Sequence, residues 1–261
     1  MLPDRAFAYV DSQGKRRLPI HDAPHVRNAL ARFGQVAFED DEARDRARTR
    51  LLRAAKKHGI VPIGFVNTEL RPHRNLPTGT VTFLVVDIER STELLGRLGD
   101  GYAPVLSSVR RLVRRAVGQD AGVVVDARGD DVFAVFGSAP RALASALAIQ
   151  RTMRAGPWPK GIDVLVRIGL HRGRPTLADT GYVGLSVHAA ARIGAAAHGG
   201  QIVLSGAVQS AVASSLSDDV GVRGLGSWRF RGLPEPIELF QAEAPDLPAT
   251  FPPPRSAEPA A

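Results

Sequence analysis

Short apolar runs alternate with longer periodic stretches from Thr80 to about Ala244. The short runs are rich in valine, leucine and phenylalanine and have the length of buried β-strands. They lie at residues 80–86, 122–127, 131–136, 163–175, 201–205 and 227–242. The longer stretches have apolar residues three and four positions apart, which is typical of helices that bury one face. These predicted helices lie at residues 91–117, with a break near Gly99, and at 140–155, 186–197 and 207–216.

The links between the predicted strands indicate how the sheet is connected. The Arg-Gly-Asp link at 128–130 and the Leu-Pro-Glu-Pro link at 233–236 are short enough for hairpins. Hairpins join antiparallel strands, whereas parallel strands need a longer crossover. We therefore expect an α/β (α+β) fold in which helices cover a mostly antiparallel or mixed sheet.

A different pattern precedes this region. Residues 1–66 form a small, charge-dense module, in which residues 6–20 predict two short strands about a Ser-Gln-Gly turn. Two helices follow, one at 22–33 with Asp22 as its N-cap and one at 40–58 that ends at Gly59. Prolines and a glycine make residues 67–79 a linker between this module and the domain at 80–244. The Pro- and Ala-rich tail at 245–261 is expected to be disordered.

Basic residues line one face of the second predicted helix. Arg46, Arg50, Arg53 and Lys57 are spaced four, three and four positions apart, so they fall on one stripe. Such a stripe is either a surface for nucleic acid or an acidic partner, or an ordinary solvated face. The solvated face is the favoured interpretation, because no DNA-binding motif accompanies the stripe.

Composition excludes several classes of protein. The 261 residues carry a formal charge of +8, which favours anionic partners but also arises from arginine-rich codon usage. Since cysteine is absent, disulfides, thiolate metal sites and cysteine nucleophiles are excluded. The sequence has neither a signal-peptide pattern nor a run of ~20 apolar residues, so we expect no membrane span and a cytoplasmic location. A zincin His-Glu-x-x-His pattern and a P-loop are also missing.

Two aspartates at strand ends are the first candidates for chemistry. Asp87 follows the apolar run at 82–86, where a bare charge costs free energy unless it is paired. Asp130 lies beside Gly129 in the predicted hairpin link. If the two strands are neighbours, these carboxylates converge and offer the oxygen ligands that Mg²⁺ prefers. Two such ions about 3.5–4 Å apart activate an attacking oxygen and stabilise a leaving oxygen.

Five motifs in order carry a resemblance to a known family. They are "FLVVDIERST", "DARGDDVFAVF", "RIGLHRGRP", "YVGLSVHAAARI" and "FRGLPEPIELFQ". Together they resemble the class III nucleotidyl cyclase catalytic domain, most nearly its actinobacterial type, over residues 80–244. The resemblance implies a ferredoxin-like fold and a head-to-tail homodimer with active sites at its interface. It also implies that a purine nucleoside triphosphate, with ATP the expected one, is converted to its 3′,5′-cyclic monophosphate and pyrophosphate.

The resemblance assigns roles to residues that match its motifs. Asp87 and Asp130 match the two aspartates that hold two Mg²⁺ or Mn²⁺ ions, and Arg192 matches the transition-state arginine that the partner protomer supplies. The remaining matches contact the triphosphate; they are Ile88, Ser91, Thr92, Arg174 and Arg231. For the three arginines, a surface salt bridge is the alternative.

Three positions depart from the family pattern. Asp126 stands where a base-selecting lysine or glutamate is expected, Gly181 where a base-selecting aspartate is expected, and His188 where a transition-state asparagine is expected. We therefore expect poor discrimination between bases and low activity, with Asp179 a weak substitute at the base. His188 either replaces the positioning hydrogen bond or is a histidine buried at the dimer interface. The alternative to an enzyme is a catalytically silent nucleotide-binding or dimerisation module in signalling.

Overall fold

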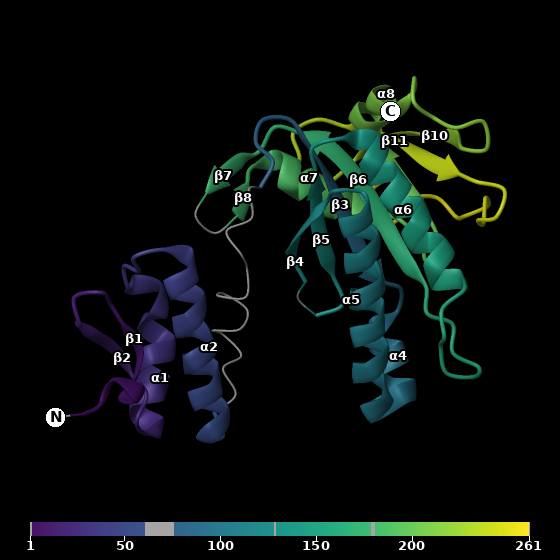
Figure 1. Ribbon diagram of the computed structural model, residues 1–261. Coiled ribbons are helices and arrows are strands. Elements are labelled where there is room, and N and C mark those ends of the chain that lie inside the picture. Colours follow the sequence, from purple (N-terminus) through teal and green to yellow (C-terminus); the bar gives the residue numbers. More distant parts are fainter. Residues whose placement is uncertain (1, 61–75, 128, 179–180, 261) are drawn as a thin grey trace. The chain divides into compact units, whose positions relative to one another are not determined.

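A computed structural model describes residues 2–60, 76–127, 129–178 and 181–260 of the chain. It divides into two compact units, Met1–Asn75 and Leu76–Ala261, which are considered separately (Figure 1). Most of the predicted linker at 67–79 lies outside the described residues. Of the helices that are described, none combines the length and apolar character needed to cross a bilayer.

Within residues 2–60, the N-terminal unit packs two helices on a hairpin. Strands β1 (Phe7–Val10) and β2 (Arg16–Pro19) pair antiparallel, and helices α1 (Ala23–Arg32) and α2 (Asp41–Lys57) follow. Short 3₁₀ helices occupy Asp4–Ala6 and Phe33–Gln35. The core of the unit includes the fully buried side chains of Val26, Phe33 and Leu51.

Helix α2 exposes its basic stripe. Its N-cap, Asp40, accepts a 2.6 Å hydrogen bond from the backbone N–H of Ala43, as short polar caps do. Arg46, Arg50, Arg53 and Lys57 are all exposed. Exposure is consistent with both interpretations of this stripe, the favoured solvated face and the surface for nucleic acid or an acidic partner, and the second stays a prediction.

The C-terminal unit is built on an eight-stranded sheet, in the order β12-β10-β11-β9-β6-β3-β5-β4. All neighbouring strands pair antiparallel except β6 and β9, which are parallel. The mostly antiparallel α+β fold expected from the sequence is thereby confirmed. The strands of the sheet are β3 (Val81–Ile88), β4 (Val123–Asp126), β5 (Val132–Phe136), β6 (Val166–Gly173), β9 (Ile202–Ser205), β10 (Gly221–Arg229), β11 (Ile237–Glu243) and β12 (Glu258–Pro259).

Helices cover both faces of this sheet. They are α4 (Ser91–Leu98), α5 (Tyr102–Gln119), α6 (Ala139–Arg154), α7 (Leu185–Ala196) and α8 (Gly206–Val212), with a 3₁₀ turn at Gly99–Gly101 between α4 and α5. Because side chains alternate along a strand, β3 sends Leu84, Val86 and Ile88 into the core shared with α5 and α6. Phe83 and Val85 face α7 instead. Asp87 therefore lies on the α7 face.

The structure differs from the sequence expectation in the long strand at 163–175. Strand β6 covers only Val166–Gly173, and a separate hairpin of β7 (Thr176–Ala178) and β8 (Gly181–Val183) follows. Arg174, an exposed residue in the connection to β7, lies outside both strands. The apolar run ends at Leu170, and residues 171–174 carry no apolar side chain that would indicate where the strand ends.

The expectation of a disordered tail at 245–261 is wrong for the described residues, which end at 260. Strand β12 pairs with β10, and the carbonyl of Ala249 accepts hydrogen bonds from Arg223 (2.9 Å) and Gln241 (2.8 Å). The composition of the tail indicated disorder because it has few apolar residues. Its partners lie in strands far away in the sequence, so the pattern of the tail itself carries no sign of them.

Candidate active site

Three carboxylates meet at one end of the sheet. Oxygens of Asp87, Asp130 and Asp131 all lie within 4.8 Å of one another. Asp87 is 8% exposed, Asp130 is half-buried and Asp131 is exposed. The sequence predicted that Asp87 and Asp130 converge, and the structure brings them together with Asp131 as a third member.

Strand pairing explains this convergence. Strands β3 and β5 are antiparallel neighbours, and Val86 pairs with Val132. The residue that follows Val86 therefore lies beside the residues that precede Val132. Gly129 turns the chain with a φ of 54°, a left-handed conformation that glycine adopts without strain. The Arg110 guanidinium of α5 donates a hydrogen bond to the Gly129 carbonyl and ties this turn to the helix.

Asp87 also has a basic partner on the neighbouring strand. It is paired with Arg167 of β6 in the sheet register, and the two side chains form an ion pair. The Nε of Arg167 donates to Asp87 Oδ2 at 2.6 Å, while its Nη1 donates to the Ala195 carbonyl at 3.3 Å. Arg167 thus stabilises a nearly buried carboxylate and fixes its direction. Both of its contacts with the Asp87 carboxylate, from Nε and from Nη2, are made to Oδ2.

Desolvation and the neighbouring negative charge alter the protonation of Asp131. Partial desolvation raises the pKa of Asp131 to about 6, and the charge and hydrogen bond of Asp87 and the charge of Asp130 add to the effect. Like charges that share a site disfavour ionisation in this way. A divalent cation would remove this repulsion. The donor set consists only of carboxylate oxygens, which suits Mg²⁺ or Mn²⁺ better than zinc or copper.

The loop after β3 carries the next group of predicted residues. Ile88 ends the strand and is buried, Ser91 and Thr92 begin α4, and Arg90 is the residue before the helix. Arg90 has φ 52° and ψ 41°, a left-handed conformation that costs a non-glycine residue on the order of 1 kcal/mol. The loop therefore has a fixed, strained shape directly beside Asp87.

The two altered base-selecting positions lie close together. Asp126 ends β4, and its own carboxylate accepts a 2.8 Å hydrogen bond from the backbone N–H of Ala127. A Cβ on Gly181 would lie 3.8 Å from Cγ1 of Val125, the residue before Asp126. Gly181 has φ 120°, so a side chain at this position would be strained. Asp179 lies outside the described residues.

The predicted transition-state residues share one face of α7. His188 and Arg192 are four positions apart and both are exposed. Arg174 and Arg231 are exposed as well, each in a connection that follows a strand. Among the described residues of one protomer, no ion pair or side-chain hydrogen bond engages Arg192, Arg174 or Arg231. Their roles stay predictions.

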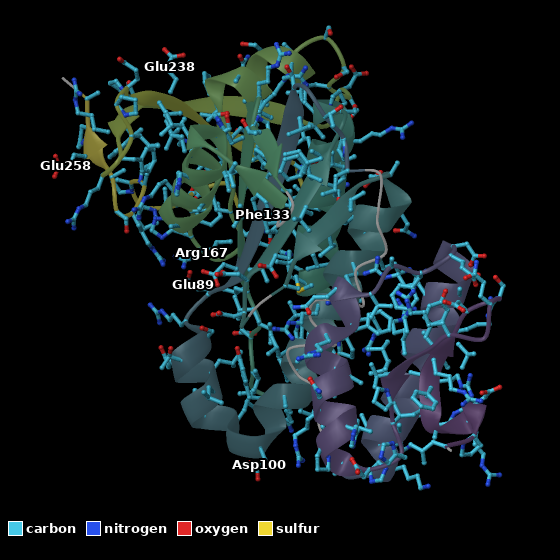
Figure 2. The ribbon with its side chains drawn as sticks, turned by 90° about the vertical axis from the view of Figure 1, so that its left-hand side faces the viewer. Glu89, Asp100, Phe133, Arg167, Glu238 and Glu258 are labelled. Carbon is cyan, nitrogen blue, oxygen red and sulfur yellow. The ribbon has the colours of Figure 1, made fainter. Side chains whose placement is uncertain are left out.

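Sequence reasoning missed Asp131, Arg167 and a contact from the tail. Asp131 was visible as the second acid of an Asp-Asp pair. Arg167 was visible as a charge within an otherwise apolar strand, which usually needs a partner. Arg255 of the tail forms an ion pair with Glu89, which lies close to Arg167 (Figure 2). Nothing in the sequence indicated that pair, because 166 residues separate the two.

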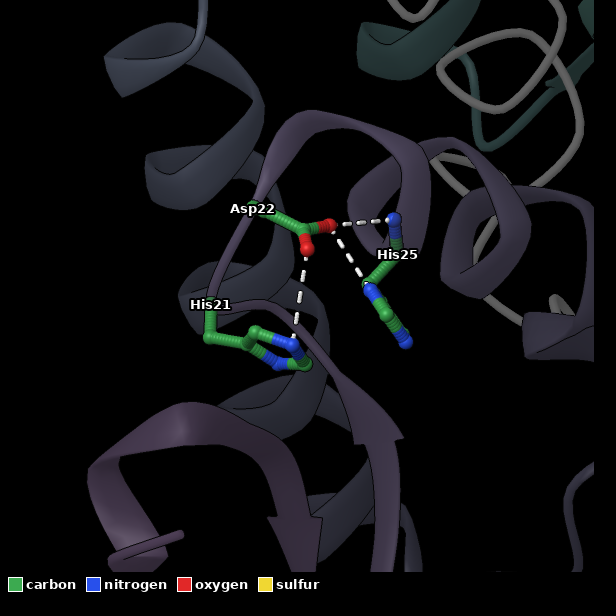
Figure 3. A group of neighbouring side chains, drawn as sticks. All are labelled: His21, Asp22 and His25. Carbon is green, nitrogen blue, oxygen red and sulfur yellow. Dashed lines mark hydrogen bonds and ion pairs between the residues drawn. The ribbon is translucent and has the colours of Figure 1, made fainter.

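A second group of possible metal ligands lies in the N-terminal unit (Figure 3). The Asp22 carboxylate caps α1 by accepting from the backbone N–H of His25 at 2.9 Å, and it also contacts the His25 ring at 2.7 Å. His21 lies 3.5 Å from the same carboxylate. Capping accounts for Asp22, so we assign no ligand to this group.

A cleft of about 370 Å³ lies on the other side of the β3–α4 loop. Its lining mixes acidic and basic side chains, namely Glu89, Arg90, Glu93, Arg97, Asp163, His198 and Arg255, with Leu94 and Leu165. None of the three clustered aspartates lines it. The arrangement that can bind a cation against phosphate oxygens is therefore the aspartate cluster and not this cleft.

Comparison with known sequences divides the chain in the same way. Residues 2–62 match a family of unknown function (DUF6582). The uncharacterized protein Rv0891c of Mycobacterium tuberculosis is 38% identical over 194 residues, which cover 74% of this chain and 66% of that protein. The chain thus spans just under two thirds of the length of this relative. An adenylate cyclase of Lachancea kluyveri is 28% identical over 161 residues, 52% of this chain and 9% of that protein.

Solved structures share the fold of the larger unit. An adenylate/guanylate cyclase/hydrolase from Silicibacter pomeroyi is 28% identical with a TM-score of 0.56, covering 64% of this chain and 97% of that one. A monomeric adenylate cyclase from Trypanosoma brucei has a TM-score of 0.59 at 24% identity, covering 70% of this chain and 97% of that one. The matching fold, the five ordered motifs and the cyclase relatives agree. The larger unit has the fold of class III adenylate/guanylate cyclase catalytic domains and resembles that family in its ordered motifs.

Proposed function

We propose that the chain is a nucleotide cyclase that converts a purine nucleoside triphosphate, preferentially ATP, to the 3′,5′-cyclic monophosphate and pyrophosphate. The reaction would take place at the interface of a cytoplasmic homodimer. The observation that carries this proposal is the cluster of Asp87, Asp130 and Asp131, whose oxygens lie within 4.8 Å of one another at the sheet end of a cyclase fold.

The aspartates would hold two Mg²⁺ or Mn²⁺ ions. When bound, such ions supply Lewis-acid stabilisation of the attacking and leaving oxygens. Arg167 orients Asp87, while the turn at Gly129 presents Asp130 from the neighbouring hairpin. Ile88, Ser91 and Thr92 would place backbone and hydroxyl donors near the triphosphate, at the start of α4.

The remaining contacts with the substrate would come from the second protomer. Arg192 would meet the charge that grows on the phosphate oxygens, a role for which its planar fork is suited. His188, one turn away, would position the ribose. Arg174 and Arg231 would add positive charge near the triphosphate. Three large apolar side chains near the start of α7 are 43–58% exposed, which favours self-association there; they are Leu177, Val183 and Leu185.

Selection of the base would be weak. Asp126 offers only acceptors, and Gly181 offers only its backbone. Restoring an aspartate at Gly181 would place a side chain at φ 120°, so the gap cannot be filled without strain. The preference for ATP rests on the family resemblance and not on these two residues.

The direct test is to incubate the purified chain with Mn²⁺ and ATP, then GTP, and to measure cyclic nucleotide and pyrophosphate. We expect both products from the wild-type chain. In Asp130→Asn, the rate of product formation should fall by about 100-fold or more, since the loss of even an outer-sphere partner of a metal lowers activity 10- to 100-fold. The matched control is Asp100→Asn, an exposed aspartate in the turn between α4 and α5 (Figure 2). Equal activity in the two variants would contradict the proposed metal site.

A second candidate is a catalytically silent module that binds nucleotide or pairs protomers in signalling. The ion pair between Asp87 and Arg167 favours it, because a built-in cation already offsets part of the cluster charge. Metal-dependent nucleotide binding distinguishes the two. Binding without turnover in the wild-type chain, lost in the double variant Asp87→Ala/Asp130→Ala, would favour the silent module.

A further inference from the structure

The C-terminal tail contacts the loop after β3, the strand that carries Asp87. The Arg255 guanidinium forms two hydrogen bonds with the Glu89 carboxylate, at 2.8 and 3.1 Å. The Glu89 side chain is only 10% exposed, and its backbone N–H donates to the Leu165 carbonyl at 2.9 Å. Although burial of Glu89 opposes its ionisation, the hydrogen bonds and charge of Arg255 hold its pKa below the ordinary value. A two-pronged arginine–carboxylate pair of this kind fixes orientation as well as distance.

Arg255 is itself held from a second side. Its Nε donates to His198 Nδ1 at 2.9 Å, which leaves the other ring nitrogen of His198 to donate to the Pro253 carbonyl at 3.0 Å. Phe251 stacks on the same ring at a centroid distance of 6.4 Å. The guanidinium is therefore placed by His198 in a single direction, toward Glu89.

The same tail residue also contacts the end of α7. The backbone N–H of Arg255 donates to the Ala196 carbonyl at 2.9 Å. One residue earlier, the Ala195 carbonyl accepts from Arg167, the partner of Asp87. Two arginines thus join the end of β3 and its loop to the C-terminal end of the helix that carries Arg192. Both connections lie within one protomer.

The loop needs an external restraint. Arg90 follows Glu89 in a left-handed conformation that a non-glycine residue keeps only when its surroundings impose it. Glu89, fixed at its backbone and at its carboxylate, supplies that constraint on one side of Arg90. Asp87 lies two residues before Glu89, so a shift of this loop moves the metal-binding carboxylate.

We propose that Arg255 is a positioning residue that fixes the β3–α4 loop, and through it Asp87, for divalent-metal binding. This role rests on the proposed cyclase function for its catalytic consequence, but metal binding itself tests it without turnover. The residue acts through Glu89 and touches neither substrate nor metal. The C-terminal segment is therefore a working part of the active site.

The tail offers a matched control for a purely structural role. Arg151 of α6 forms a similar two-pronged pair with Asp246, at 2.8 and 3.1 Å, near the beginning of the same tail. That pair anchors the tail but does not contact the β3–α4 loop. Arg151→Gln removes an anchor of the tail and leaves the Glu89 contact in place.

The experiment measures Mn²⁺ affinity by electron paramagnetic resonance on the full chain, in Arg255→Gln, Glu89→Gln, their double variant and Arg151→Gln. We expect a loss of about tenfold in Mn²⁺ affinity for each of the first two, as for other outer-sphere partners, and no further loss in the double variant. Arg255→Lys keeps the positive charge but cannot form the bidentate pair with Glu89. Its Mn²⁺ affinity should lie between those of the wild type and Arg255→Gln. Arg151→Gln should bind Mn²⁺ like the wild type. Where turnover is observed, the Mn²⁺ concentration for half-maximal rate should rise in parallel.

Each result decides the matter. Equal affinity in Arg255→Gln and Arg151→Gln, or additive losses in the double variant, would overturn the positioning role. A wild type that binds Mn²⁺ in an Arg255-dependent manner but forms no cyclic product would support the positioning role and overturn the cyclase. A wild type that binds no Mn²⁺ would overturn both. Tryptophan fluorescence separates unfolding from lost positioning, because Trp158 and Trp228 both lie in this unit.

Discussion

At the scale of single residues, the charges near the candidate site are arranged in pairs that share one helix end. Asp87 contacts Arg167 and Glu89 contacts Arg255, and both arginines reach carbonyls in the last turn of α7. A nearly buried carboxylate without such a partner would be costly. The pairs therefore place an arginine beside each acidic side chain at the end of an apolar strand.

His171 in β6 shows the opposite solution, a buried base kept neutral. Burial lowers its pKa from 6.5 to about 4. The unfolded chain takes up a proton near pH 6.5, whereas the folded chain does so only near pH 4. The free energy of unfolding should therefore fall as pH drops from 6.5 to 4, by about 3 kcal/mol at most from this group.

His171→Gln should remove that part of the pH dependence, as measured by urea unfolding followed through tryptophan fluorescence at several pH values. The control is Ser205→Ala, which removes the 3.0 Å hydrogen bond to the His171 ring but keeps the ring buried. This control should retain the pH dependence. The same pH dependence in His171→Gln as in the wild type would show that His171 is not the responsible group.

At the scale of elements, two glycines let α7 lie directly on the sheet. A Cβ on Gly169 of β6 would lie 2.5 Å from Cα of Gly194 in α7, and a Cβ on Gly194 would lie 3.0 Å from Cβ of Val85. Side chains at either position would push the helix away from β3 and β6. This close approach is what brings the carbonyl of Ala195 within reach of Arg167.

Gly169→Ala should destabilise the unit by about 1–3 kcal/mol, the usual cost of overpacking, and should lower cyclase activity because α7 shifts. Gly118→Ala in α5 is the control, since nothing lies within 4 Å of the added Cβ. Alanine at position 118 should raise the free energy of unfolding by roughly 0.5–1 kcal/mol. Urea midpoints measured through tryptophan fluorescence and rates of product formation test both variants. An unchanged midpoint in Gly169→Ala would mean that the helix adjusts without cost.

The sequence predicted most elements because their signals are local. Short apolar runs located β3 and β5, and the short link at 128–130 indicated that β4 and β5 form a hairpin. The pattern did not determine that β3 and β5 are neighbours, so the approach of Asp87 to Asp130 was expected only from the family resemblance. The contact between Glu89 and Arg255 was not expected at all, since it depends on how the tail returns across the sheet. The end of β6 at Gly173 was also missed, because residues 171–174 carry no apolar side chain that would indicate it.

At the scale of the whole molecule, the two units have separate cores and separate relatives. The N-terminal unit matches a family of unknown function over residues 2–62, and the larger unit has the cyclase fold. The exposed stripe on α2 belongs to the first unit, whereas the aspartate cluster belongs to the second. A role for the N-terminal unit in regulation is thus a separate question from catalysis.

Assembly is where the cyclase proposal makes its most demanding prediction. If each active site takes its aspartates from one protomer and Arg192 from the other, Asp130→Asn and Arg192→Ala should each be inactive alone. When the two variants are mixed and allowed to exchange subunits, about half of the dimers are heterodimers, and each heterodimer has one intact site out of two. About a quarter of the wild-type rate should therefore return. The control mixes Asp130→Asn with Asp87→Asn. Because both changes affect the same half-site, every site in that mixture is broken and no activity should return. Recovery in both mixtures, or in neither, would contradict an interface at which the two protomers supply different groups.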